Sequence, residues 1–151
     1  MVNPIKILLA DDNANEYIFF KHALSKVNTP IEIRSLKGGV ELLDYLSAPE
    51  SQLPDIFFLD INMPMKNGKD CLASIRDSDK YRHLPVVMYS TSDTRSDIDE
   101  SYELDADLYL VKPAELDDLR LLLTYVIDKY QKNELKRPER SDFVLHASAL
   151  R

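Results

Sequence analysis

Short apolar runs alternate with longer amphipathic segments along most of the chain. The runs are rich in branched and aromatic side chains, which predicts strands at Ile5–Ala10, Ile31–Leu36, Ile56–Leu59, Val86–Ser90 and Leu108–Val111. The run at 56–59 is apolar throughout, as is typical of a strand buried on both faces of a parallel sheet. The run at 31–36 alternates apolar and polar residues, which indicates an edge strand with one exposed face.

The segments between these runs have the spacing of helices. Apolar residues between Tyr17 and Val27 recur every three or four positions, and Asn13 and Asn15 before them are candidate helix caps. The clearest amphipathic pattern covers residues 116–130. Strands that alternate with helices predict an α/β fold, a doubly wound, five-stranded parallel sheet covered on both faces. The connections should be right-handed crossovers.

One domain and a tail account for the length. The chain has 151 residues, enough for one core of ordinary size, and we assign residues 1–130 to it. From Gln131 to Arg151 charges of both signs mix, Pro138 interrupts any helix, and a small apolar cluster occupies positions 143–145. We expect this charged tail to be flexible or involved in assembly. It is too short for a DNA-binding domain.

Composition and charge narrow the classes of function. The net charge of −7 argues against a direct nucleic-acid partner, because binding the phosphate backbone needs a basic face. The single cysteine, Cys71, excludes an internal disulfide and agrees with a reducing compartment. No apolar run approaches the roughly 20 residues that a membrane helix needs. We therefore expect a cytoplasmic protein without membrane insertion.

Chemically useful side chains follow four of the predicted strands. Asp11 and Asp12 follow the strand at 5–10, and Asp60 follows the strand at 56–59. Ser90 ends the strand at 86–90, and Lys112 follows the strand at 108–111. Because the carboxyl ends of parallel strands meet at one edge, where ligands bind in α/β sheets, these five side chains should lie together. Each alone has an ordinary explanation as a helix cap or an exposed charge. Their joint occurrence, in chain order, favours a functional site.

Three carboxylates in one crevice repel each other unless a cation compensates them. A hard divalent ion such as Mg²⁺ fits, because it prefers oxygen ligands and keeps several waters. With the metal and Lys112 supplying positive charge, the Asp60 carboxylate could attack a phosphoryl group and form an acyl phosphate. The Ser90 hydroxyl would then sense the phosphoryl oxygens through a hydrogen bond.

Four motifs carry a family resemblance: Leu-Leu-Ala-Asp-Asp-Asn at 8–13, Phe-Leu-Asp-Ile-Asn-Met-Pro at 58–64, Pro-Val-Val-Met-Tyr-Ser at 85–90 and Leu-Val-Lys-Pro at 110–113. On these motifs the sequence resembles the receiver domain of two-component response regulators, over about residues 5–130. The proline-containing loop before position 55 and the run Ser90-Thr91-Ser92-Asp93 resemble small standalone receivers, including those paired with phytochrome-type histidine kinases.

The resemblance implies a flavodoxin-like receiver fold with sheet order 2-1-3-4-5. It makes Asp60 the phosphoacceptor and Lys112 a contact of the phosphoryl group. Asp11 and Asp12 would hold Mg²⁺ together with Asp60 and the backbone carbonyl of Asn62.

The resemblance also assigns residues around this centre. Ser90 would be the switch hydroxyl, and Tyr109 the aromatic residue that turns inward when that hydroxyl is drawn to phosphate. Asn62 and Ser92 resemble positions that tune dephosphorylation. Pro113 is a candidate for a cis peptide bond.

The function implied is that of a single-domain response regulator. A histidine kinase or histidine phosphotransfer protein would phosphorylate Asp60 in a Mg²⁺-dependent reaction, and a partner-binding surface would switch. Such a domain assists its own phosphorylation and dephosphorylation but is a signalling domain rather than an enzyme. Ile18 and Phe19, off the apolar face of their helix, either widen the core stripe or dock the kinase. Either of the last two helices offers a surface for a homodimer.

Two positions depart from the family pattern. Asp105 stands where the family usually has the glycine that ends the fourth helix, so a left-handed backbone there requires Asp to tolerate it. Ala114 replaces the aromatic residue common after Lys-Pro. Both lie near the usual output face, so they bear on partner binding and not on the phosphorylation chemistry.

Two other classes of function stay open. One is an enzyme: a phosphatase with an aspartyl nucleophile, or a flavin carrier on a similar sheet. Such phosphatases place a second Asp two positions after the nucleophile, but Asn13 stands there after Asp11, and flavin phosphate would meet carboxylates instead of a hydroxyl- and Gly-rich loop. The other class is an interaction module that keeps the fold without phosphorylation, against which the complete set of site residues argues.

Overall fold

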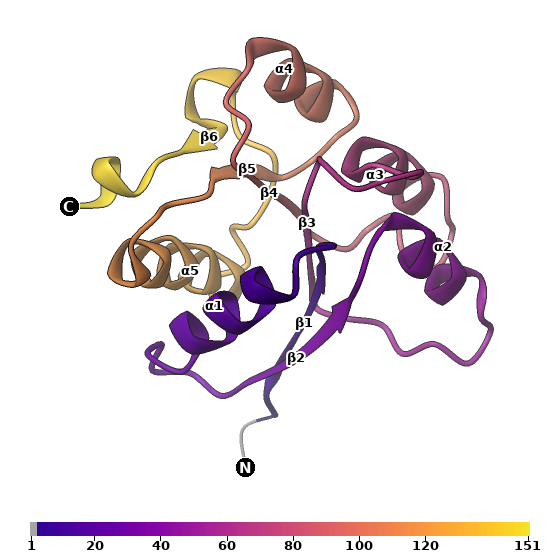
Figure 1. Ribbon diagram of the computed structural model, residues 1–151, viewed down its shortest axis with the longest axis horizontal. Coiled ribbons are helices and arrows are strands. Elements are labelled where there is room, and N and C mark those ends of the chain that lie inside the picture. The colour runs from indigo at the N-terminus through magenta and orange to yellow at the C-terminus, as the bar shows by residue number, and fades with distance from the viewer. Residues whose placement is uncertain (1–2) are drawn as a thin grey trace.

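The computed structural model describes residues 3–151 (Figure 1). Its strands are β1 (Ile5–Ala10), β2 (Ile31–Leu36), β3 (Ile56–Leu59), β4 (Val86–Ser90), β5 (Leu108–Val111) and β6 (Val144–Leu145). Its α-helices are α1 (Ala14–Leu24), α2 (Gly39–Ser47), α3 (Gly68–Arg76), α4 (Arg95–Glu103) and α5 (Leu116–Gln131). Two short 3₁₀-helices, η1 (Arg140–Asp142) and η2 (Ala147–Leu150), flank β6.

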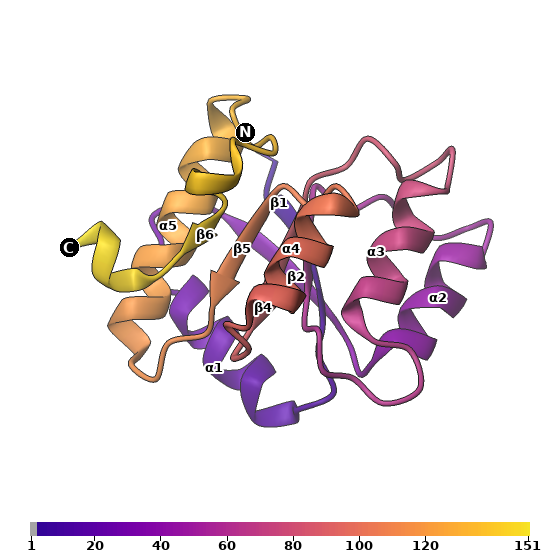
Figure 2. The same cartoon turned by 90° about the horizontal axis from the view of Figure 1, so that it is seen from above.

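The strands form one sheet in the order β2-β1-β3-β4-β5-β6, and every pair is parallel. Helices α1 and α5 cover one face, and α2, α3 and α4 cover the other (Figures 1 and 2). This arrangement confirms the predicted doubly wound α/β fold. Within residues 3–151 no helix combines the length and the apolar character needed to cross a membrane.

Burial explains why the central strand is apolar throughout. All four residues of β3 are fully buried, with Phe58 packed toward α1 and Phe57 toward α3 and α4. The ring of Phe20, on α1, meets the ring of Phe58 edge-on at a centroid distance of 5.1 Å. Cys71 is buried in the opposite layer, as a small apolar side chain would be.

The sheet has six strands, and the prediction of five was wrong. The sixth, β6, comes from the tail at 131–151, which folds back over the β5 edge and pairs Val144 with Tyr109. Next to it, Phe143 is fully buried and its ring meets the Tyr102 ring edge-on at 5.0 Å. A strand of two residues has too weak a pattern to be read from the sequence, and it is stable here because it covers an otherwise unpaired edge. An assembly role for the tail stays a prediction.

The end of α4 adopts the expected left-handed backbone. Asp105 has φ of 71°, a value that Asp tolerates better than most residues, and the Arg76 guanidinium donates to its carbonyl oxygen at 2.9 Å. Arg76 also donates to the Asp107 carboxylate at 2.9 Å, which anchors the turn into β5. Among the described residues no peptide bond is cis, so the prediction for Pro113 was wrong.

The first residue of α3 packs against the backbone next to the predicted site. A Cβ atom on Gly68 would lie 2.2 Å from the carbonyl oxygen of Asp60 and 2.9 Å from the Ile61 Cα. Gly68→Ala is therefore expected to displace backbone and to destabilise the protein by about 1–3 kcal/mol, measured by urea unfolding. Ser74→Ala, in the same helix, is the control and should leave stability within about 0.5 kcal/mol. A native midpoint for Gly68→Ala would contradict the close approach.

Candidate functional site

The predicted acidic residues meet at the carboxyl ends of β1 and β3. These strands are neighbours, with Ala10 opposite Leu59, so the residues that follow them, Asp11 and Asp60, lie side by side. One carboxylate oxygen from each of Asp11, Asp12 and Asp60 lies within 4.8 Å of the others. Asp11 is 3% exposed and Asp60 6%, whereas Asp12 is open to solvent. Parallel pairing thus gathers residues that are 49 positions apart (60 minus 11).

Lys112 reaches the same place from the end of β5. Its Nζ donates to Asp11 Oδ2 at 2.8 Å and lies 3.5 Å from Asp60 Oδ2. Its backbone N–H donates to the Ser90 carbonyl at 2.8 Å, which ties the start of the following loop to β4. Burial lowers the pKa of the Lys112 ammonium, but the carboxylates around it more than offset that effect and raise the pKa above its usual value. Lys112 is therefore a charged ammonium.

The surroundings of Asp60 disfavour its ionised form when no metal cation is bound. Burial raises its pKa from 3.8 to about 6, and the negative charge of Asp11 adds to the increase, while Lys112 and the backbone N–H of Asn62 oppose it. One ammonium among three crowded carboxylates leaves net negative charge. A hard divalent cation fits this set of oxygen ligands, and would lower the pKa of Asp60 by stabilising its ionised form.

The two predicted switch residues are joined through the loop after β4. Ser90 is fully buried, and its Oγ accepts a hydrogen bond from the Ser92 backbone N–H at 3.1 Å. Tyr109 lies inward and fully buried, and its Oη donates to the Ser92 carbonyl at 2.7 Å. Ser90 and Tyr109 therefore both form a hydrogen bond to the backbone of Ser92. The Ser92 hydroxyl itself bonds to the Asp97 carboxylate.

The two predicted docking residues on α1 differ in their surroundings. The side chain of Ile18 is 63% exposed. Phe19 is partly buried and packs against the core layer that contains α5. Ile18 is thus a surface apolar residue, whereas Phe19 contributes to the core stripe. Docking by either residue stays a prediction.

Two further residues belong to the site, Glu16 on α1 and Tyr89 on β4. Tyr89 Oη donates to Glu16 Oε1 at 2.7 Å, and Glu16 Oε2 lies 3.8 Å from Lys112 Nζ. The only signals in the sequence were an acid in the first turn of the first helix and a tyrosine before Ser90. Both patterns are common, so neither singled these residues out.

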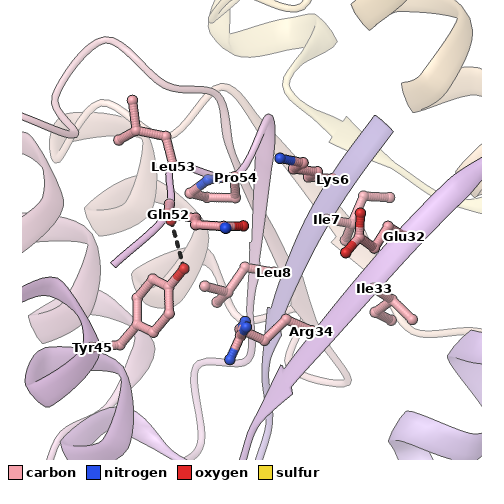
Figure 3. A pocket seen from close by; sticks show the side chains of 10 residues that line it. All are labelled: Lys6, Ile7, Leu8, Glu32, Ile33, Arg34, Tyr45, Gln52, Leu53 and Pro54. Carbon is pink, nitrogen blue, oxygen red and sulfur yellow. Dashed lines mark hydrogen bonds between the residues drawn. The ribbon is translucent and has the colours of Figure 1, made fainter. Parts of the chain in front are cut away.

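A hollow of about 300 Å³ lies on β1 and β2 (Figure 3). Its lining comes from these strands, from Tyr45 on α2 and from the segment at 52–54, and none of the predicted site residues lines it. The Tyr45 hydroxyl donates to the Gln52 carbonyl at 2.5 Å and so closes one wall. The chemistry predicted for the strand ends is not located there.

A sequence model of the response regulator receiver domain matches residues 7–124. The chain belongs to this receiver family. Response regulator Rcp1 of Synechocystis sp. is 32% identical to it, over 78% of this chain and 83% of Rcp1. The protein called Probable methanogenesis regulatory protein FilR2, of Methanothrix harundinacea, is 31% identical over 78% of each chain.

Solved receiver structures agree with the fold and with the narrower resemblance. The phosphorylated cyanobacterial phytochrome response regulator RcpA superimposes with a TM-score of 0.78 at 30% identity, over 87% of this receiver and 96% of RcpA. The Mn²⁺-bound form of Rcp1 gives a TM-score of 0.75 at 28% identity, over 89% of this receiver and 99% of Rcp1. These likenesses confirm the predicted kinship with phytochrome-associated receivers.

Proposed function

We propose that this receiver takes a phosphoryl group onto Asp60 from a histidine kinase or a histidine phosphotransfer protein, in a Mg²⁺-dependent reaction. One observation carries the proposal: the nearly buried Asp60 lies in a cluster with Asp11 and Asp12, with the Lys112 ammonium 3.5 Å away. Membership of the receiver family supports it. RcpA is a phosphorylated relative, and Rcp1 binds Mn²⁺.

The reaction balances as a displacement at phosphorus. An oxygen of the Asp60 carboxylate attacks, an acyl phosphate bond forms, and the P–N bond to the donor histidine breaks, leaving that imidazole neutral after it takes up a proton. Lys112 holds positive charge beside the transferred oxygens. Mg²⁺, held by Asp11, Asp12, Asp60 and the backbone carbonyl of Asn62, would supply further neutralisation when bound.

The response to phosphorylation would pass through the loop after β4. The Ser90 hydroxyl accepts from the Ser92 N–H, and Tyr109 holds the Ser92 carbonyl, so a turn of Ser90 toward a phosphoryl oxygen moves a loop that Tyr109 also holds. A shift from one per cent to ninety-nine per cent of the active state would take about 5.5 kcal/mol of differential stabilisation. Asn62 and Ser92 are proposed to tune dephosphorylation.

A signalling role accounts for these features better than catalytic turnover. We propose that Ile18, exposed on α1, is the main contact for the phosphodonor, with Phe19 supporting it from the core. The output of the switch is a surface that binds a protein partner in the cytoplasm. A second copy of the chain is one such partner, and its binding gives a homodimer. The net charge of −7 supports the absence of direct nucleic-acid binding.

Intact-mass analysis after incubation with acetyl phosphate tests the proposal. The native chain should gain one phosphoryl group with Mg²⁺ and none with EDTA, because Lys112 alone leaves net negative charge on the crowded carboxylates. Failure to gain mass, with no binding of beryllofluoride, would overturn the proposal in favour of an interaction module that works without phosphorylation. Turnover of a phosphate monoester would instead favour an enzyme, and a yellow preparation a flavin carrier.

A further inference from the structure

Two further side chains, Glu16 and Tyr89, lie near the Lys112 ammonium in addition to Asp11 and Asp60. Glu16 Oε2 lies 3.8 Å from the Lys112 Nζ. The Nζ also lies over the ring of Tyr89, 5.1 Å from the centroid, a cation–π distance. The Lys112 side chain is only 8% exposed, so these contacts form most of its surroundings.

Tyr89 and Glu16 form a pair with one defined geometry. Tyr89 is fully buried, and the Phe20 ring meets it edge-on at 5.4 Å, which sets the plane of its ring. Its Oη donates to Glu16 Oε1 at 2.7 Å, so one carboxylate oxygen is engaged and the other remains for Lys112. Burial and the negative charge of Glu16 raise the pKa of Tyr89 far above its usual value, so the phenol stays a donor.

We propose that Glu16 and Tyr89 are positioning residues that hold the Lys112 ammonium beside Asp60 during phosphoryl transfer. The inference rests on the proposed function and names two further residues for it. A lysine has a flexible four-carbon stem and no fixed fork of donors, so its place depends on the groups around it. The acceptors Asp11 and Asp60 belong to the acidic cluster, whereas Glu16 does not. Glu16 thus remains an acceptor for Lys112 when a cation and a phosphoryl group engage Asp11 and Asp60.

Tyr89→Phe isolates this role. The variant keeps the ring that packs on Phe20 and faces Lys112, and it removes only the hydroxyl that holds Glu16. With Glu16 released, the ammonium is less well placed, and the rate constant for phosphoryl uptake from acetyl phosphate should fall about tenfold. The affinity for Mg²⁺, measured by calorimetry, should stay native because neither residue belongs to the acidic cluster.

Tyr102→Phe is the matched control. Its hydroxyl donates to the Pro138 carbonyl at 2.8 Å, a bond between α4 and the tail, so the variant loses a comparable hydrogen bond that involves neither Glu16 nor Lys112. Uptake by this variant should match the native rate. A second series changes Glu16: Glu16→Ala should slow uptake, and so should Glu16→Gln, because its one amide oxygen accepts from Tyr89 and the NH2 group, a donor, then faces Lys112.

A double-mutant cycle with Lys112→Met decides whether the effect passes through Lys112. The inference expects Tyr89→Phe to slow uptake in the native background and to have no further effect when Lys112 is methionine. An equal slowing in both backgrounds, or a native rate in Tyr89→Phe, would overturn the inference alone. No uptake by the native chain would overturn the proposed function and this inference with it.

Discussion

Replacing Asp60 with asparagine is expected to abolish phosphoryl uptake and, at the same time, to stabilise the unmodified protein at pH 7.5. The first effect follows because an amide oxygen is not the nucleophile that a carboxylate is. The second follows because the carboxylate is ionised at this pH although burial and Asp11 disfavour its charge. Intact mass after acetyl phosphate treatment measures the first effect, and urea unfolding in EDTA measures the second.

The stability effect has a defined pH window. The pKa of Asp60 is raised from 3.8 to about 6, so between these values the folded protein binds more protons than the unfolded chain. The contribution of Asp60 to stability therefore falls as pH rises through this window, and its full cost applies above about pH 6. A shift of this size corresponds to about 2–3 kcal/mol. The advantage of Asp60→Asn should be largest at pH 7.5 and should vanish near pH 4.

Asp44→Asn is the control for this comparison. Asp44 is exposed on α2, so its replacement should change stability by less than about 0.5 kcal/mol at pH 7.5. Saturating Mg²⁺ should also reduce the advantage of Asp60→Asn, because a cation that binds the folded native chain stabilises it. Phosphoryl uptake by Asp60→Asn would place the acceptor elsewhere. A stability difference that does not vary with pH would contradict the raised pKa.

Phe143→Ala is expected to lower the free energy of unfolding by about 3–5 kcal/mol, the largest loss from a single truncation that we predict. Phe143 is fully buried between the Tyr102 and Tyr109 rings, at centroid distances of 5.0 and 6.2 Å. Its carbonyl also accepts from the Tyr109 backbone N–H at 3.0 Å. Domains have total stabilities of about 5–15 kcal/mol, so the loss is a large share.

Two measurements test this prediction. Urea unfolding gives the loss of stability, and hydrogen exchange at the Tyr109 amide should become faster because its acceptor is in the released segment. Val40→Ala is the control, since Val40 is 41% exposed and its truncation should cost less than about 1 kcal/mol. A loss for Phe143→Ala as small as that of the control would show that the tail contributes little to the stability of the domain.

The local pattern of apolar and polar residues was sufficient to predict the strands β1 to β5 and the sheet that they form. Four of these strands are short apolar runs, whereas β2 alternates apolar and polar residues. Each strand begins and ends at the predicted residues because a proline or a polar residue flanks each end. The cluster of Asp11, Asp60 and Lys112 followed from the same reasoning, since parallel strands bring their carboxyl ends to one edge whatever the sequence between them. The family motifs were then enough to identify a receiver.

Other features depend on contacts that no local pattern records. β6 has two residues and forms only because the β5 edge is available to pair with it. Glu16 and Tyr89 are 73 positions apart, and their hydrogen bond exists because α1 packs over β4. Neighbours on one helix, Ile18 and Phe19, differ in exposure because the position of α5 decides which of them is covered.

The sequence by itself thus determined the class of fold, the side chains that gather at the strand ends and the family. The first two depend on periodicity and on residue type at the ends of elements, and the family depends on short motifs. Only the tertiary structure decided what holds Lys112, how Tyr109 is placed and where the tail lies. Those features depend on distances between elements that are far apart in the chain, and such distances are set by packing of the whole core.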